Sequence, residues 1–351
     1  MRFTEQEGIS VRIVVTGVAG SVGSRVATRL VGESDTDVVG IDRVAARSEG
    51  LASHHLGDLR AVDLDEIFEG ADTIVHLASA YGRSEFVDAS RHDTRAARMT
   101  LDAAARAGAG QFVLLSSAMV YGARPENPIP ITEHARVRPN ALAFAENKAT
   151  IERFANEWRE STGAKLTVLR PSTAVAPGGS SWVARSMQLA AGLGSDSNPA
   201  LQFLHLDDLA DAVAILVRQQ AEGVFNVAPD GWVRAEEVRS LSGRAPRLPI
   251  PAPIADEIVR FSWSKGIVAT PPGIMPYATE PWVVANDKLR HLGWEPSWSN
   301  VEAYVDSFDP RPWANLNAKR RQQLAMGGAA AGVTAAATAA RFLTRYWAGR
   351  G

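Results

Sequence analysis

The chain contains no cysteine among its 351 residues. That absence excludes disulfide bridges, thiolate metal sites and a cysteine nucleophile. No stretch of the body is dense in lysine and arginine with interleaved aromatic residues, and the formal net charge is only −2, so we expect no nucleic-acid partner. Residues 1–10 hold two glutamates and no apolar run, which indicates neither a secretory signal nor a transit peptide and predicts a cytoplasmic location.

Acidic residues are missing from one region, the tail that follows Asp309, where every charged side chain is basic. We expect residues 311–351 to form a separate alanine-rich tail. Phe342 and Trp347 among arginines suit the surface of an anionic membrane, but the apolar stretch is too weak to span a bilayer. Peripheral membrane contact and docking of the tail on the body or on a partner subunit are both open.

Apolar strand patterns and amphipathic helix patterns alternate regularly through the first half of the chain. This alternation predicts an α/β protein whose parallel sheet is covered by helices on both faces. The expected strands are 11–16, 38–41, 73–78, 111–116 and 166–169, and the expected helices are 21–31, 64–69, 86–107 and 144–161.

Beyond Pro171 the alternation weakens and loops rich in glycine and proline become frequent. We therefore predict a dinucleotide-binding core at 9–170 and a mixed segment at 171–310, which completes the sheet and forms a smaller substrate lobe. A strand followed by a helix is still expected over 201–217, with Asp207 or Asp208 as the helix cap.

The strongest motif is TGVAGSVG at residues 16–23, where a strand gives way to a helix. Gly17 permits the turn, Gly20 lets the backbone approach a pyrophosphate, and Gly23 lets the helix pack close to the strand. The helix N-terminus adds unpaired N–H groups and a favourable dipole. The predicted cofactor contacts in this motif are Gly17, Gly20, Ser21, Val22 and Gly23.

Asp42 ends the second predicted strand, at about the separation expected of a carboxylate that binds a ribose hydroxyl pair. An acidic side chain there repels a 2′-phosphate and so favours NAD over NADP, whereas the adjacent Arg43 weakens that preference. Asp42 and Arg43 are both predicted cofactor contacts, and Asp42 as an ordinary turn residue is the alternative interpretation.

Further segments follow in order: GDLR at 57–60, HLAS at 76–79, SSAMVYG at 116–122, and a lysine and a glutamate four residues apart at 148 and 152. In this ordered series, over roughly residues 11–304, the chain resembles the extended short-chain dehydrogenase/reductase family, which is NAD-dependent epimerase/dehydratase-like. The resemblance implies a Rossmann-type doubly wound parallel sheet with a smaller C-terminal substrate lobe, and a homodimer through the helices at 86–107 and 144–161. The further cofactor contacts that it implies are Asp58, Leu59, Leu77, Ala78, Ser79, Lys148 and Pro171.

The family's chemistry uses a tyrosine as acid or base, a lysine four residues later, and a serine or threonine that binds the substrate oxygen. Ser117 and Lys148 match this pattern, but Phe144 stands at the tyrosine position. Phenylalanine carries no exchangeable proton, and loss of a positioned acid or base costs about 10²- to 10⁴-fold in rate.

Phe144 leaves several interpretations open. In the first, the protein is an NAD(P)-dependent oxidoreductase or epimerase-like enzyme in which Tyr121, Tyr81, His205, water or the substrate handles the proton. In the second, the fold is kept as a cofactor-binding sensor or partner without turnover. Non-redox lyase or isomerase chemistry with a structural NAD is the third.

Two substitutions argue against a nucleotide sugar as substrate. The resemblance places Thr173 where the family's sugar-nucleotide enzymes carry an asparagine and Leu201 where they carry an arginine, and a diphosphate needs such donors. We therefore predict a small, apolar metabolite with a secondary alcohol or ketone, and no metal site. The expected substrate contacts are Tyr81, Ser117, Met119, Tyr121, Phe144, Thr173, Val175, Trp182 and His205.

Overall fold

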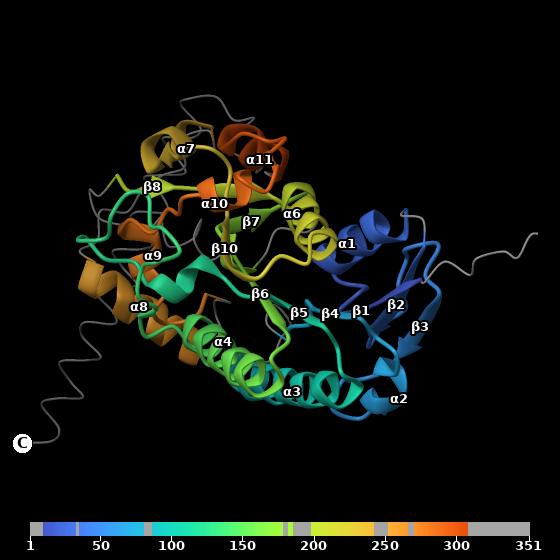
Figure 1. The fold of residues 1–351 in the computed structure, drawn as a ribbon. Coiled ribbons are helices and arrows are strands. Elements are labelled where there is room, and N and C mark those ends of the chain that lie inside the picture. Colours follow the sequence, from blue (N-terminus) through green and yellow to red (C-terminus); the bar gives the residue numbers. More distant parts are fainter. Residues whose placement is uncertain are drawn as a thin grey trace, which may run out of the picture.

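Seven parallel strands form the central sheet of the protein (Figure 1). The computed structural model describes residues 10–32, 35–80, 86–177, 182–184, 198–241, 252–265 and 270–307. In spatial order the strands are β3 (Ser53–Leu56), β2 (Thr36–Asp42), β1 (Val11–Thr16), β4 (Thr73–His76), β5 (Gln111–Leu115), β6 (Lys165–Pro171) and β10 (Gly223–Val227). The order reverses between β1 and β4, which is the doubly wound Rossmann arrangement, and such a switch point opens a crevice at the carboxyl ends of the strands.

Helices cover both faces of this sheet, as its buried apolar strands require. On one face α1 (Ser21–Val31) packs against α6 (Leu206–Arg218), and their apolar stripes join the strands in one core cluster. On the other face α2 (Leu64–Phe68), α3 (Phe86–Ala107) and α4 (Ala143–Thr162) close a second cluster (Figure 1). The predicted fold class is therefore confirmed.

A third apolar cluster lies beyond the carboxyl ends of β5 and β6 and belongs to the smaller lobe. Short strands organise this lobe: β7 (Thr173–Val175) pairs with β9 (Phe203–His205), and β8 (Ala200–Leu201) pairs with β11 (Val233–Arg234). The remaining elements are η1 (Ala118–Tyr121), α7 (Ala235–Leu241), α8 (Ala252–Ser264), α9 (Met275–Thr279), α10 (Asp287–Arg290) and α11 (Asn300–Ser307).

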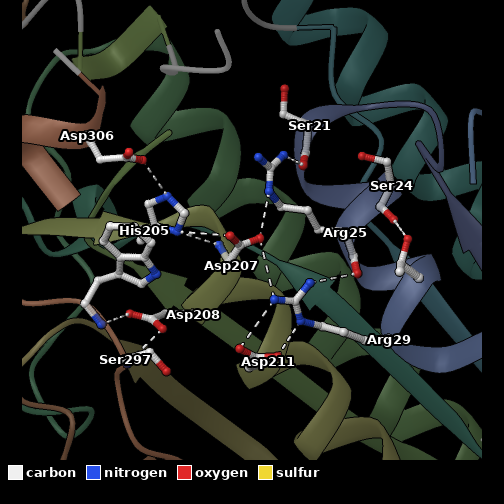
Figure 2. Close-up of polar contacts among 12 residues, drawn as sticks. Ser21, Ser24, Arg25, Arg29, His205, Asp207, Asp208, Asp211, Ser297 and Asp306 are labelled. Atoms are coloured by element: carbon white, nitrogen blue, oxygen red, sulfur yellow. Dashed lines mark hydrogen bonds and ion pairs between the residues drawn. The ribbon is translucent and has the colours of Figure 1, made fainter. Parts of the chain in front are cut away.

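The cap of α6 differs from the prediction, which was Asp207 or Asp208. His205 is the cap, and its Nδ1 accepts the backbone N–H of Asp207 at 3.2 Å (Figure 2). The other ring nitrogen, Nε2, then donates to Asp306 at 3.2 Å, and the ring stacks on Trp298. The strand β9 continues directly into the helix, so the buried imidazole reaches the first turn before either aspartate can.

Asp208 instead ties a later segment of the chain to α6. Its two carboxylate oxygens accept the backbone N–H groups of Ser297 and Trp298 at 2.9 and 3.1 Å (Figure 2). Asp208 is fully buried, and burial raises the pKa of its carboxyl group. This contact fixes the approach to α11 against the sheet.

The predicted tail at 311–351 lies outside the described residues, as does Tyr81. Within the described part of the chain, no helix has both the length and the apolar character that crossing a bilayer requires.

We predict that Asp208→Ala lowers the free energy of unfolding by about 1–3 kcal/mol for each amide left unpaired. Asp211→Ala is the control, since Asp211 lies one turn later with a half-exposed side chain paired with Arg29. Such an exposed pair contributes about 0–1 kcal/mol. Urea denaturation followed by circular dichroism measures both values, and equal losses would contradict the anchoring role of Asp208.

Candidate functional site

A glycine-lined corner joins β1 to α1. Gly17 has φ of +75°, a conformation that side chains disfavour, and a Cβ on it would lie 2.7 Å from the backbone nitrogen of Ala78. A Cβ on Gly23 would lie 2.0 Å from the carbonyl oxygen of Gly17. Gly20 donates its N–H to that same oxygen at 3.0 Å. The three glycines therefore allow helix, turn and strand to approach more closely than any other residue type would.

The N-terminus of α1 opens from this corner toward a cavity. Its first turn carries no acidic residue and its cap, Gly20, supplies no side-chain hydrogen bond. The helix dipole is therefore uncompensated there, which favours an anion. At the end of β2, Asp42 accepts the backbone N–H of Ala19 at 3.0 Å, so this carboxylate also braces the glycine turn.

A second carboxylate lies beyond Asp42, at the end of β3. Arg60 donates two side-chain hydrogen bonds to Asp58, at 2.8 and 2.7 Å, and its backbone N–H donates a third. The hydrogen bonds from Arg60 hold the pKa of Asp58 well below its usual range. Asp58 is thus a fixed, charged acceptor on the cavity wall.

One cavity of about 530 Å³ connects the glycine corner with the carboxyl ends of β5 and β6. This volume is within the range of about 300–1,000 Å³ that is typical of small-molecule and cofactor sites. All fourteen predicted cofactor contacts line it: Gly17, Gly20, Ser21, Val22, Gly23, Asp42, Arg43, Asp58, Leu59, Leu77, Ala78, Ser79, Lys148 and Pro171. Of the predicted substrate contacts, five line it: Ser117, Met119, Phe144, Thr173 and Trp182.

Ser117 and Lys148 both line this cavity. Ser117 caps η1, where its Oγ accepts the N–H of Met119 at 3.2 Å, so its own proton can be donated to a ligand. Lys148 is buried in α4, and its Nζ donates to the carbonyl oxygen of Leu115 at 2.9 Å. Burial lowers the pKa of Lys148, while the charges of Asp93 and Glu152 oppose that shift.

Phe144 takes the place on α4 one turn before Lys148. Its ring meets the edge of Trp182 at 5.1 Å between centroids, and Lys148 Nζ lies 5.8 Å from the ring centre. The position is half-buried on the cavity wall. An apolar ring therefore stands there, next to the serine and the lysine, and it offers no proton.

Three predicted substrate contacts do not line the cavity: Tyr121, Val175 and His205. The hydroxyl of Tyr121 donates to Asn226 at 2.8 Å and accepts from Arg170 at 2.9 Å, so it belongs to a buried network. His205 is occupied by the α6 cap and Asp306. Both side chains thus have structural partners and lie outside the lining of the cavity.

That buried network supports the segment after β5 that carries Ser117. Arg170 on β6 forms a two-pronged ion pair with Glu152 at 3.0 and 2.6 Å, and both side chains are 6% exposed. The hydroxyl of Ser116, next to the candidate serine, donates to the same carboxylate. The family-like lysine-to-glutamate spacing in α4 is thus explained: the glutamate anchors β5 and β6.

Four further residues that line the cavity were not among the predicted contacts: Asp93, Ser172, His92 and Trp282. Ser172 Oγ is buried with no hydrogen-bond partner in the described structure. Asp93 had a detectable signal, since it falls on the buried stripe of α3 formed with Ala89, Ala97 and Thr100. A charged residue on an apolar stripe is rarely buried without a partner, and that pattern could have identified it.

Relatives with similar sequences include uncharacterised proteins and enzymes named for nucleotide sugars. An uncharacterised protein of Mycobacterium tuberculosis is 26% identical over 322 residues, which cover 85% of this chain and 84% of the relative. A dTDP-glucose 4,6-dehydratase of Streptomyces niveus is 32% identical over 179 residues, covering 45% of this chain and 52% of that enzyme.

Solved structures share the fold at low identity. MoeE5 in complex with UDP-glucuronic acid and NAD aligns with a TM-score of 0.65 at 22% identity, over 84% of this chain and 97% of that one. The UDP-glucose 4-epimerase of Thermus thermophilus in complex with NAD aligns with a TM-score of 0.63 at 22% identity, over 85% and 97%.

The sequence profile of the NAD dependent epimerase/dehydratase family matches residues 13–228, more than half of the chain. This match spans the glycine corner, Ser117 and the helix α4 that carries Lys148. The chain belongs to the NAD dependent epimerase/dehydratase family.

Proposed function

We propose that this protein is an NAD-preferring enzyme that moves a hydride at a secondary alcohol or ketone of a small metabolite other than a nucleotide sugar. The observation that carries the proposal is the continuous cavity lined by the glycine corner, Ser117 and Lys148. Ser117 orients the substrate oxygen by donating its hydroxyl proton, and Lys148 holds the nicotinamide ribose.

The residues present fit a dinucleotide. A Cβ at Gly17 or Gly23 would collide with backbone, so the corner is shaped for close approach, and the α1 N-terminus beside it is uncompensated. Asp42 and Asp58 offer carboxylates to ribose and adenine, and Asp42 disfavours a 2′-phosphate. When bound, NAD supplies the carbon that accepts or returns the hydride.

The far end of the cavity supports an apolar substrate. Met119, Phe144, Trp182 and Trp282 line it, and Trp282 uses its indole N–H on the carbonyl oxygen of Tyr277, leaving the ring as apolar surface. Leu201 stands at the position where the family's sugar-nucleotide enzymes carry an arginine. It packs in the apolar core of the lobe and does not line the cavity. This wall offers little positive charge to a sugar diphosphate.

A cofactor-binding protein without turnover is the second candidate, and Phe144 is the observation that favours it. The two candidates separate in one experiment. Purified protein with NAD is incubated with a panel of hydrophobic secondary alcohols, and the absorbance of reduced nicotinamide is followed. Reduction of NAD by a member of the panel supports the enzyme, whereas tight NAD binding with no reduction supports the second candidate.

Calorimetry with UDP- and dTDP-sugars on the NAD-loaded protein tests the substrate class, and micromolar binding of a nucleotide sugar overturns that part of the proposal.

We predict that Gly23→Ala weakens NAD binding by at least about 100-fold, because its methyl group must push α1 away from the Gly17 carbonyl and so misplace the helix N-terminus. Fluorescence titration with NADH measures this change. Gly32→Ala at the other end of α1 is the matched control, since a Cβ there meets only the Thr28 oxygen at 3.9 Å. Comparable losses in both variants would show that the effect is not specific to the corner.

Phe144→Tyr is expected to raise turnover of any alcohol found in the panel by about 10²- to 10⁴-fold, because it returns a positioned phenol one turn before Lys148. The same substitution at Phe154, on the α3 side of the same helix and stacked with Arg98, serves as the control and should leave turnover unchanged. Initial rates of nicotinamide reduction give the comparison. No gain in Phe144→Tyr would mean that the substrate oxygen does not lie beside residue 144.

A further inference from the structure

One buried hydroxyl group on the cavity wall has no hydrogen-bond partner. Ser172 is 7% exposed and lines the cavity, and its Oγ makes no hydrogen bond within the described residues. Folded proteins pair nearly all of their buried polar groups, so each exception needs an explanation. The other buried side-chain atoms without a partner in the described part of the chain belong to residues outside the cavity lining: Arg12, His54, Asn147, Trp158 and Thr270.

The backbone around Ser172 fixes its position. Its own N–H donates to the carbonyl oxygen of Val227 on β10 at 2.9 Å. The residue before it, Pro171, ends β6, and the residue after it, Thr173, begins β7, which pairs with β9. Ser172 therefore lies at a junction between paired strands, and rotation of its side chain among the staggered rotamers redirects the hydroxyl. Such a rotation lets the hydroxyl meet a ligand atom against this wall.

Ser172 leaves the sheet close to Ser117. Strands β5 and β6 are still paired at this point, since the N–H of Ser116 donates to the carbonyl oxygen of Leu169 at 2.8 Å. Ser117 and Ser172 are thus within one residue of the same level, on neighbouring strands that lie about 4.8 Å apart. The hydroxyl of Ser116 is engaged by Glu152, whereas Ser117 Oγ accepts a backbone N–H and keeps its own proton for a ligand.

We propose that Ser172 is a specificity-determining residue that binds a second oxygen of the substrate, so that the substrate is a hydroxy ketone or the corresponding diol. The proposal rests on the proposed function, because it takes the oxygen bound by Ser117 as the reacting one. Two anchors on neighbouring strand ends suit oxygens whose carbons are adjacent or one carbon apart. A serine hydroxyl both donates and accepts, so it fits a hydroxyl or a carbonyl oxygen.

The apolar character of the wall makes this contact selective. Met119, Phe144 and Trp182 line the same cavity with apolar surface. An apolar ligand group placed against Ser172 leaves its hydroxyl unpaired, whereas a ligand oxygen pairs it. A buried polar group discriminates against an analogue that lacks the matching group, because the unpaired state is costly. The substrate is therefore largely apolar with one oxygen in addition to the reacting one.

Stability measurements test whether the Ser172 hydroxyl is unpaired in the protein without ligands. Ser172→Ala should leave the midpoint of urea unfolding unchanged or raise it, because the substitution removes no hydrogen bond. Ser116→Ala removes a hydroxyl that is bonded to Glu152 and should lower the midpoint. Circular dichroism follows both transitions. A decrease in Ser172→Ala as large as that in Ser116→Ala would show that the hydroxyl serves the fold, and it overturns the proposal.

Binding measurements test the ligand class. Calorimetry on the NAD-loaded protein compares cyclic and aromatic ketones with their 2-hydroxy and 3-hydroxy derivatives. We expect the wild type to bind at least one hydroxy ketone about 10- to 100-fold more tightly than the parent ketone. Ser172→Ala should bind the two equally, and Ser161→Ala, exposed near the C-terminal end of α4, should keep the wild-type ratio. Equal affinities in the wild type, or a ratio that persists in Ser172→Ala, overturns the proposal.

The same variants separate this inference from the proposed function. If Ser172→Ala weakens the binding of NAD itself by about 10-fold or more, the hydroxyl contacts the cofactor, and the substrate contact is overturned while the proposed enzyme stands. If hydroxy ketones bind in a manner that depends on Ser172 but none exchanges a hydride with the nicotinamide, the contact stands and the proposed function fails. Absence of binding by every ketone and hydroxy ketone overturns both.

Discussion

The close approach of α1 to β1 is the constraint on which the rest of the site depends. Gly17 and Gly23 leave no room for a Cβ between helix and strand, so the first turn of α1 sits directly above the sheet's switch point. That position places an uncompensated helix N-terminus at one end of the cavity. It also sets α1 against α6, where Arg25 and Arg29 pair with Asp207 and fix the first turn of α6 (Figure 2).

The other end of the cavity is held by buried polar contacts and not by backbone shape. The Glu152–Arg170 pair joins α4 to β6, and Ser116 and Tyr121 extend it to β5 and β10. Burial of these charges is costly unless every donor and acceptor finds a partner. Because the network meets that condition, it stabilises the position of Ser117 relative to Lys148, which is what a reaction between fixed partners needs.

The sequence was most informative where local chemistry decides the structure. The glycine corner and the bounds of α1 and α3 follow from periodicity and turn residues, and the structure agrees with them. Tertiary contacts decided the rest. Asp207 and Asp208 are good caps by residue type, but the buried His205 reaches the turn first. Tyr121 carries a reactive hydroxyl in sequence, yet Arg170 and Asn226, 49 and 105 residues away, take it out of the cavity. Separations of that length leave no mark in a local pattern.

The replacement of a phenol by a phenyl ring changes the electrostatics of its neighbours as well as its own chemistry. A hydroxyl at residue 144 would solvate the Lys148 ammonium, whereas the Phe144 ring offers only its π face at 5.8 Å. The amine therefore depends more on the remaining anions for its charge, and the Arg170 pair already engages Glu152. Asp93 is left to stabilise the ammonium, while its own burial favours its neutral form. Burial therefore disfavours the charged form of both Asp93 and Lys148, and the attraction between the two charges opposes that effect.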